Sequence, residues 1–277
     1  MKKIPDRNKL KKSLKFDPLM VSFSFLALIL LLFVFVTLSY MIIAQVTSDF
    51  PGLIAAAKNE SVIKSIHLSL YAGLLATVVS FLVAVPAAYI LSRKEFFGKH
   101  VVESVLDIPV VVPHTVAGIA LLTIFGSRGL LGGPLESYIQ FRDALPGIIV
   151  AMLFVSAPFL TNSAREGFQN IDPRIENAAR SLGAPLWKTF LLITLPIAAR
   201  HLLIGSIMCW ARAISEFGAV VMIAYYPMVG PTLIYQRFIS NGLSASRPIA
   251  VLLILVTLTI FIAVRLLSAG WRTYDTD

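Results

Sequence analysis

Long apolar segments dominate this chain, and they decide the environment in which it can fold. The first covers residues 19–46 and contains an uninterrupted apolar stretch at 25–36. A bilayer-crossing helix needs about 20 mostly apolar residues, whereas the apolar core of a signal peptide has only about 7–15. The segment exceeds that shorter length and no small-residue cleavage site ends it, so we expect a retained membrane helix.

Five more segments of the same kind follow, at about 63–91, 104–125, 145–164, 198–224 and 248–267. Together they predict an all-α, polytopic membrane protein with about six transmembrane helices, because a lipid-facing helix satisfies its own backbone hydrogen bonds. The composition agrees, since 57% of the residues are hydrophobic and only 14% are charged. Soluble domains average about 45–50% and about 25%, which argues against a soluble enzyme and a disordered chain.

The pattern of the spans makes three further predictions. Pro109 and Pro113 should kink or break the third span near its start, because proline lacks an N–H and clashes with the preceding turn. The short, mixed segment 47–62 should form an external loop. The two halves of the chain show no clear pair of interrupted helices, which is the pattern typical of many secondary transporters.

The formal charge of +9 indicates how the chain is oriented in the membrane. With the spans placed as above, 17 of the 24 Lys and Arg residues lie on one side and 6 on the other, while Arg212 lies inside a span. Because loops rich in Lys and Arg stay cytoplasmic, both termini are expected on the cytoplasmic side. The basic tail, residues 1–18, then acts as a topology signal beside anionic lipid headgroups and needs no nucleic-acid partner.

The cytoplasmic segment 165–200 is long for a loop and has helical patterning of its own. Asp172 followed by Pro173 is a good helix start, with an N-cap residue and then proline in the first turn. Gly183 lies where a left-handed cap would end this helix, and a second short helix runs from Pro185 until Pro196 stops it. The first helix gathers its apolar residues on one narrow face: Ile175, Ala178, Ala179 and Leu182. We therefore expect a helix–turn–helix over 172–195.

The faces of this helix pair suggest what it contacts. The first helix has small residues on its apolar face and carries Glu176 and Asn177, while the second has Trp187 on its apolar face. Small residues let the backbone of another protein approach closely, which favours docking into a protein groove. The alternative is an amphipathic pair that rests in the lipid interface.

The spacing within this loop resembles the signature loop of ABC-importer permeases. The family pattern is Glu-Ala-Ala, three residues, Gly, nine residues and Ile-x-Leu-Pro. This chain has Asn177-Ala178-Ala179, Gly183 and Ile193-x-Leu195-Pro196 at the same intervals. The departure is Asn177, which stands where the family usually has Glu, with Glu176 one position earlier.

The resemblance implies that this loop is the coupling helix, which seats in a groove of a cytoplasmic ATPase. Ala178, Ala179 and Gly183 would make the tight contact. Glu176, Asn177, Arg180 and Trp187 complete the implied contact set.

Two other stretches resemble the molybdate/tungstate and sulfate permeases of this family. One covers the third-span region at 107–122 and continues into 125–132, and the other covers 210–219 in the fifth span. With the coupling loop, the resemblance extends over a permease core of about 63–268. The Val-Pro-His-Thr-Val-Ala-Gly form at 112–118 favours molybdate/tungstate, and sulfate remains the alternative.

The family resemblance also implies partners. The chain would act as a homodimer with the pathway between its copies, two ATPase subunits would dock beneath it, and an extracellular binding protein would deliver the oxyanion. ATP would bind the ATPase, because this chain has no G-x-x-x-x-G-K-[ST] phosphate loop. We expect no cofactor, metal or catalytic site on the chain itself, and the single cysteine, Cys209, excludes a Cys-based zinc site.

Polar residues inside the spans are candidates for the pathway or gate. Arg212 and Glu216 are four residues apart and can pair on one helix face, so Arg212 either attracts the oxyanion or belongs to a structural ion pair. His114, near the expected break, either faces a water-filled path or is a satisfied buried histidine. Thr115 and Ser215 offer hydroxyls nearby.

A second class of function is an ion-coupled secondary transporter that works alone. It would need intramembrane carboxylates to couple to protons or sodium, and Glu216 is the only one well inside a predicted span.

Overall fold

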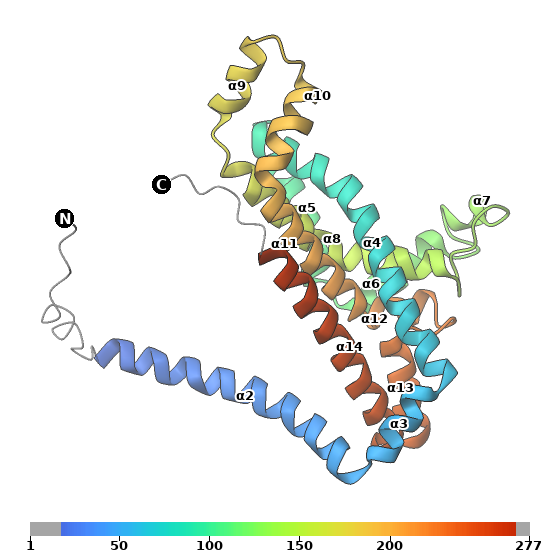
Figure 1. Cartoon of the computed structure of the whole chain (residues 1–277). Helices are drawn as coiled ribbons and strands as arrows, with labels where there is room; N and C mark the ends of the chain where they lie inside the picture. The colour runs from blue at the N-terminus through green and yellow to red at the C-terminus, as the bar shows by residue number, and fades with distance from the viewer. Residues whose placement is uncertain (1–17, 270–277) are drawn as a thin grey trace, which may run out of the picture. The chain divides into compact units, whose positions relative to one another are not determined.

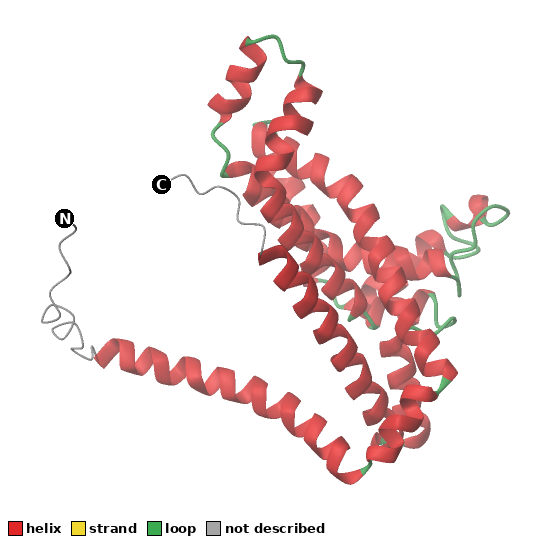
Figure 2. Cartoon of the chain, in the orientation of Figure 1, coloured by secondary structure: helices red, strands yellow, loops and turns green. Residues whose placement is uncertain are grey.

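The computed structural model describes residues 18–269, and this part of the chain is helical without strands (Figures 1 and 2). The predicted basic tail lies outside the described residues apart from Pro18. The helices are α2 (Pro18–Ser48), α3 (Phe50–Lys58), α4 (Glu60–Arg93), α5 (Lys99–Val111), α6 (His114–Phe125), α7 (Gly132–Leu135), α8 (Leu145–Gln169), α9 (Pro173–Ser181), α10 (Leu186–Thr189), the π-helical turn η1 (Phe190–Thr194), α11 (Leu195–Ile214), α12 (Gly218–Ile223), α13 (Gly230–Asn241) and α14 (Leu243–Ala269).

The chain divides into two compact units, residues 1–51 and 52–277. In the first unit, α2 is a single helix of 31 residues whose large apolar side chains are mostly exposed. So wide an exposed apolar surface is unstable in water and suits lipid.

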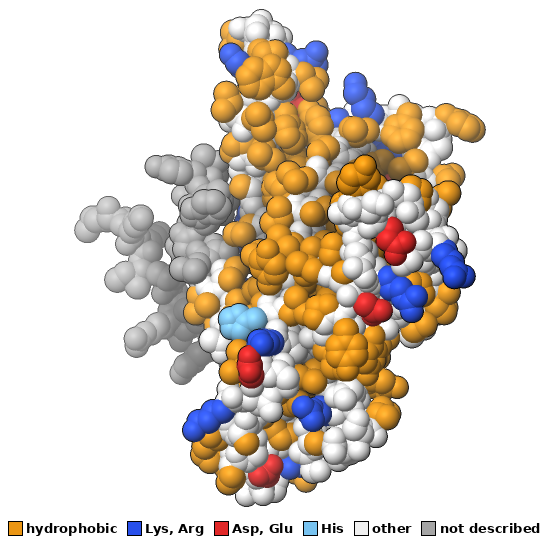
Figure 3. All heavy atoms as spheres, turned by 90° about the vertical axis from the view of Figure 1, so that its right-hand side faces the viewer, with side chains coloured by type: hydrophobic (Ala, Val, Ile, Leu, Met, Phe, Trp, Pro, Cys, Tyr) orange, Lys and Arg blue, Asp and Glu red, His pale blue; other side chains and the backbone are white. Residues whose placement is uncertain are grey.

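The second unit is a helical bundle, and the spans of the two units together agree with a multi-pass membrane protein. Over the described residues, five helices are long and apolar enough to cross a membrane: α2, α4, α8, Leu186–Ile214 and α14. The pair α5 and α6 makes a sixth if it counts as one span. Hydrophobic side chains cover much of the face seen in Figure 3, with charged side chains in small groups between them. The predicted all-α, polytopic class is therefore confirmed.

The core of this unit forms where α4, α8 and α11 run side by side (Figure 1). Small buried residues line their contacts, including Ala72 and Ala76 of α4, Ala151 of α8 and Ala213 of α11. Small side chains let membrane helices approach closely, so that dispersion contacts replace the hydrophobic effect that lipid does not supply.

The two predictions about the early spans have different outcomes. The predicted break near the start of the third span is confirmed, because α5 and α6 meet at an angle of 112° across Val112 and Pro113. Pro113 has no N–H to donate to the Pro109 carbonyl. The hydrogen-bond ladder of α5 therefore ends there, and a new helix starts at His114. The segment 47–62, expected as a loop, contains α3.

The fifth span also differs from the prediction of 198–224. Its helix is continuous from Leu186 to Ile214, so the second helix of the predicted pair runs directly into the span. Pro196 does not stop it, because the π-helical turn η1 precedes it and Leu195 N–H bonds to the Phe190 carbonyl five residues back. In such a turn the hydrogen bonds span five residues, so the helix continues although Pro196 has no N–H to donate.

No second interruption is apparent in the sequence, yet the predicted span 198–224 contains one. The fifth span ends at Ile214 and resumes as the short helix α12, and α12 packs against α6, the second half of the broken third span. Two broken spans thus meet inside the bundle. The sequence hid the second break, because 198–224 is apolar without a proline between Pro196 and Pro227.

Candidate functional site

One candidate site is the projecting hairpin, which we define as α9, α10 and the turn between them. It extends beyond one end of the bundle (Figure 1). Asp172 caps α9 as predicted, since its carboxylate accepts a hydrogen bond from the Arg174 N–H at 2.9 Å and Pro173 follows in the first turn. Gly183 has φ +92°, the left-handed conformation expected of it, so the turn has the geometry that the sequence predicted.

The outer surface of the hairpin is exposed and partly apolar. Leu182 is 90% exposed and Trp187 60% exposed, although both are large hydrophobic residues. Asn177, Ala178 and Arg180 are also exposed, and Ala179 is half-buried. An open concavity of about 520 Å³ lies in the turn, lined by Asn177, Arg180, Ser181, Gly183, Ala184, Pro185 and Leu186. A projecting element with such a surface suits contact with another protein.

Among the residues that the resemblance places against the ATPase, Glu176 is buried and contacts the bundle. It is 7% exposed, and its carboxylate lies 2.9 Å from the Arg93 guanidinium at the end of α4. Thr194 also donates to it at 2.9 Å, and the Tyr89 hydroxyl at 3.2 Å. The structure therefore commits Glu176 to contacts within the chain, whereas the resemblance placed it beside the ATPase.

The ionisation of Glu176 follows from these partners. Burial raises the pKa of Glu176, but the hydrogen bonds and charge of Arg93, with the hydrogen bond of Thr194, bring the pKa below its ordinary value of 4.5. The carboxylate is therefore charged at neutral pH. Because its folded pKa is lowered, its contribution to stability is present above pH 4.5 and is lost as the pH falls through the folded pKa.

The second candidate site is the break cluster, which we define as His114, Arg212, Ser215 and Glu216. The expected pair forms, with Arg212 Nη2 2.8 Å from Glu216 Oε2. Glu216 lies beyond the end of α11, however, and its second oxygen accepts the Ala219 N–H at 2.8 Å, so it also caps α12. At 1% exposure, this carboxylate links the two sides of the break in the fifth span.

His114 joins the break in the third span to the same carboxylate. It is the first residue of α6, with Nδ1 3.2 Å from Glu216 Oε2 and Nε2 2.9 Å from Arg212 Nη2. Its side chain is 40% exposed. Ser215, which accepts from Arg212 Nη1 at 3.2 Å, is exposed, as is Thr115.

Two glycines allow the broken helices to approach this closely. A Cβ on Gly218 would lie 2.7 Å from His114 Cβ, and a Cβ on Gly118 would lie 2.8 Å from the Ala219 carbonyl oxygen. Any side chain at either position would push α6 and α12 apart. The break cluster thus depends on glycine at both contacts.

The exposed polar groups of the break cluster lie at the broken ends of two apolar spans. A charge in that position costs about 2.5–3.5 kcal/mol by insertion scales. Polar and charged side chains in such positions usually face the bundle interior or a water-filled cavity, so His114, Arg212 and Ser215 are unsuited to facing lipid. Within residues 18–266, no group of three or more His, Cys, Asp or Glu side chains could hold a metal ion.

Sequence reasoning missed the residues that anchor the hairpin. In the sequence, Arg93 is one of the charges that set orientation, and nothing marks Tyr89 or Thr194 as contacts of the hairpin. Arg93 and Glu176 are 83 residues apart, so no helical period connects them. One sequence signal could have indicated this contact. Arg93 is an arginine in the last turn of the second span, on the predicted cytoplasmic side that also carries the coupling motif.

Comparison with known proteins places these features in a wider group. Residues 80–273 match the family "Binding-protein-dependent transport system inner membrane component". The molybdate/tungstate transport system permease protein WtpB of Pyrococcus furiosus is 42% identical over 92% of this chain and 98% of its own length. The sulfate transport system permease protein CysT of Synechocystis is 28% identical, covering 94% and 91%. A bacterial alginate ABC transporter, solved in complex with alginate pentasaccharide-bound periplasmic protein, has the same fold, with a TM-score of 0.73 at 18% identity over 92% and 96%.

Proposed function

Because the chain belongs to the family of binding-protein-dependent transport system inner membrane components, we propose that it is the permease subunit of an ABC importer for molybdate and tungstate in the cell membrane. The observation that carries the substrate assignment is the 42% identity to a molybdate/tungstate permease over 92% of this chain. The sulfate permease is more distant, at 28% identity, and supplies the alternative substrate.

The projecting hairpin is the part of this subunit that docks on the ATPase, so that the ATPase motion reaches the permease through it. Asn177, Ala178, Ala179, Arg180, Gly183 and Trp187 lie on it and form the surface for the ATPase. Two copies of the chain form a homodimer, each above one ATPase subunit, and ATP binds there rather than on this non-catalytic chain. Both termini share the cytoplasmic side with the hairpin, because 17 of the 24 Lys and Arg residues lie on that side.

Transport in this scheme is a shift between two conformations. ATP binding brings the ATPases together and moves the hairpins, and the bundle then opens to the outside, where a binding protein delivers the anion. Hydrolysis returns the inward-facing state. ATP can shift this equilibrium only as far as it binds the two states with different free energies.

The break cluster lines the pathway without holding the anion tightly. Glu216 already neutralises Arg212 at 2.8 Å, so a dianion meets a balanced pair and not a free positive charge. His114, Thr115 and Ser215 offer exposed polar groups for a passing oxyanion. Such a lining lowers the cost of passage, while selection stays with the binding protein.

An ion-coupled secondary transporter has less support from the same cluster. A coupling carboxylate must exchange its ion with water, whereas Glu216 is 1% exposed and accepts hydrogen bonds from Arg212 and Ala219. The paired broken helices therefore serve the pathway here and do not form an ion-coupling site.

The substrate is tested on the binding protein that works with this permease. We expect titration calorimetry with molybdate, tungstate and sulfate to give strong binding of the first two and weak binding of sulfate. The permease itself is then assayed in proteoliposomes for uptake of labelled molybdate with excess sulfate as competitor. Comparable affinity for sulfate, or full competition by it, would replace this assignment with the sulfate alternative.

A further inference from the structure

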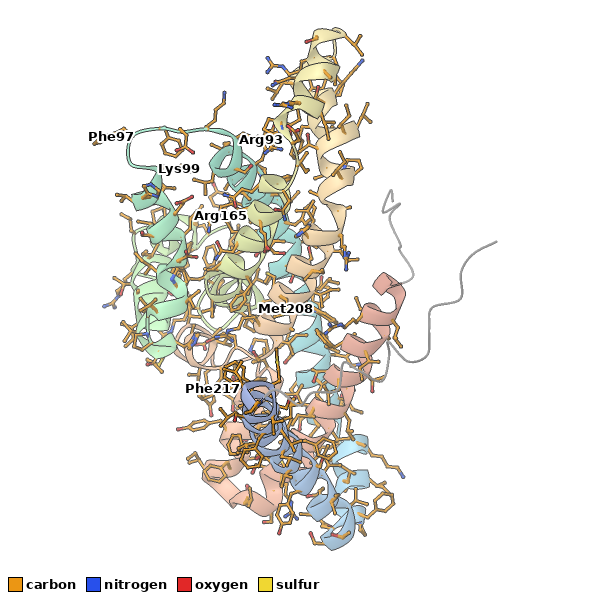
Figure 4. All side chains as sticks on the ribbon, turned by 90° about the vertical axis from the view of Figure 1, so that its left-hand side faces the viewer. Arg93, Phe97, Lys99, Arg165, Met208 and Phe217 are labelled. Carbon is orange, nitrogen blue, oxygen red and sulfur yellow. The ribbon has the colours of Figure 1, made fainter. Side chains whose placement is uncertain are left out.

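Arg93 links the projecting hairpin to the helix bundle through a single side chain. It is the last residue of α4, and Figure 4 shows it at the end of the bundle from which the hairpin projects. Its Nη1 donates to the Phe168 carbonyl at 2.8 Å and its Nη2 to the Ile171 carbonyl at 3.3 Å. These carbonyls lie at the C-terminal end of α8, where the regular helix ladder ends, and the Phe168 carbonyl also accepts the Ile171 N–H at 3.2 Å. Arg93 thus ties α4 to the end of α8.

The same guanidinium holds α9. Arg93 Nε and Nη2 donate to Glu176 Oε1 at 3.1 and 2.9 Å. Both side chains are largely buried, at 11% and 9% exposure. Charge-assisted hydrogen bonds with fixed fork geometry are among the strongest and most directional contacts in proteins. Rotation of α9 relative to α4 would break them.

Neighbouring contacts make this a junction of four elements. Thr194 of η1 donates to Glu176, which connects the junction to the helix that continues as the fifth span. The Tyr89 ring makes edge contacts with Phe168 of α8 and Phe190 of η1, and its centroid lies 5.5 and 4.9 Å from theirs. The site therefore includes α4, the end of α8, α9 and η1 in one packed group.

We propose that Arg93 is the positioning residue that makes the hairpin move as one body with α4, α8 and the fifth span, so that ATPase motion reaches the pathway. The inference rests on the proposed docking of the hairpin on an ATPase. It assigns Glu176 to this joint and not to the ATPase surface. Lysine can replace Arg93 only in part, because one ammonium cannot reach two carbonyls and a carboxylate in the same fork geometry.

The test compares uptake with ATP hydrolysis in the reconstituted complex. For Arg93→Gln and Glu176→Gln, we expect hydrolysis to continue while molybdate uptake per ATP falls about tenfold. Arg93→Lys should be intermediate. The charge-reversed double variant, Arg93→Glu with Glu176→Arg, should not recover, because glutamate at position 93 cannot donate to the Phe168 and Ile171 carbonyls.

The matched control is Arg165→Gln. Arg165 forms an ion pair with Glu103 at 3.0 Å that joins α8 to α5 and does not touch the hairpin. We expect wild-type uptake per ATP from it. An equal loss in the Arg165 and Arg93 variants would mean that any ion pair of the bundle has this effect, and would overturn the specific role of Arg93.

A second readout measures the joint itself. Nitroxide labels at Arg174→Cys on α9 and Glu95→Cys after α4, both exposed positions, are placed in a Cys209→Ala background. We expect one narrow distance distribution with Arg93 present and a broad one in Arg93→Gln. A narrow distribution with unchanged uptake per ATP would refute the proposal. Absence of ATP-driven uptake by the wild-type complex would instead refute the proposed function.

Discussion

Gly183→Asp is expected to abolish ATP-driven uptake while the protein still inserts into the membrane. Gly183 has φ +92°, and a Cβ built on it meets no atom of the chain within 4 Å. A side chain here would therefore clash only with whatever covers the hairpin, and it would add a negative charge to the proposed contact. Ala179→Glu, on the same hairpin, should also abolish ATP-driven uptake while the protein still inserts. Uptake of labelled molybdate and co-purification of the ATPase measure both effects.

Gly98→Asp is the matched control for the strain that the substitution introduces. Gly98 has φ +84° and equally open space around its Cβ, but it lies in the loop between α4 and α5. A non-glycine residue in the left-handed conformation costs about 1–2 kcal/mol at either position. We expect Gly98→Asp to keep uptake and ATPase association. If both variants lose transport equally, backbone strain and not docking explains the result.

The second large effect is expected from Glu216→Gln in the break cluster. The substitution leaves Arg212 without its counter-charge at 2.8 Å and weakens the contact with His114. Removing one partner of a buried ion pair costs about 3–5 kcal/mol, because the remaining charge stays uncompensated. We expect a clear fall in the thermal unfolding midpoint of the purified protein and a severe loss of uptake.

The double variant Arg212→Gln with Glu216→Gln separates stability from anion binding. It removes both charges, keeps groups that can hydrogen-bond across the break, and is expected to regain much of the stability lost in Glu216→Gln. If the pair is structural, uptake should return with stability. Recovered stability without uptake would show that the Arg212 charge contacts the oxyanion. Reversing the pair is a poorer test, because arginine at position 216 could not accept the Ala219 N–H.

Features carried by local sequence were predictable. Asp172 and Gly183 cap and end α9 as expected, because capping depends on residues a few positions away. The pair of Arg212 and Glu216 also formed, since four-residue spacing brings such side chains together. That same spacing did not reveal that α11 ends before Glu216, because a residue just past a helix end can still reach back to it.

Features set by tertiary packing were not predictable. Prolines indicated a break in the third span but not its angle of 112°, which α6 adopts as it packs on α12 through Gly118. Pro196 looked like a stop signal, yet a π-helical turn carries the helix through it. The contact of Arg93 with Glu176 joins distant segments, and only the folded bundle brings them together.

Uptake in proteoliposomes that contain the permease with or without its ATPase tests the central claim most directly. The binding protein loaded with molybdate is supplied outside the vesicles and ATP inside. Our account predicts uptake that needs the ATPase and hydrolysable ATP and that is insensitive to an imposed proton or sodium gradient. Gradient-driven uptake by the permease alone would contradict it.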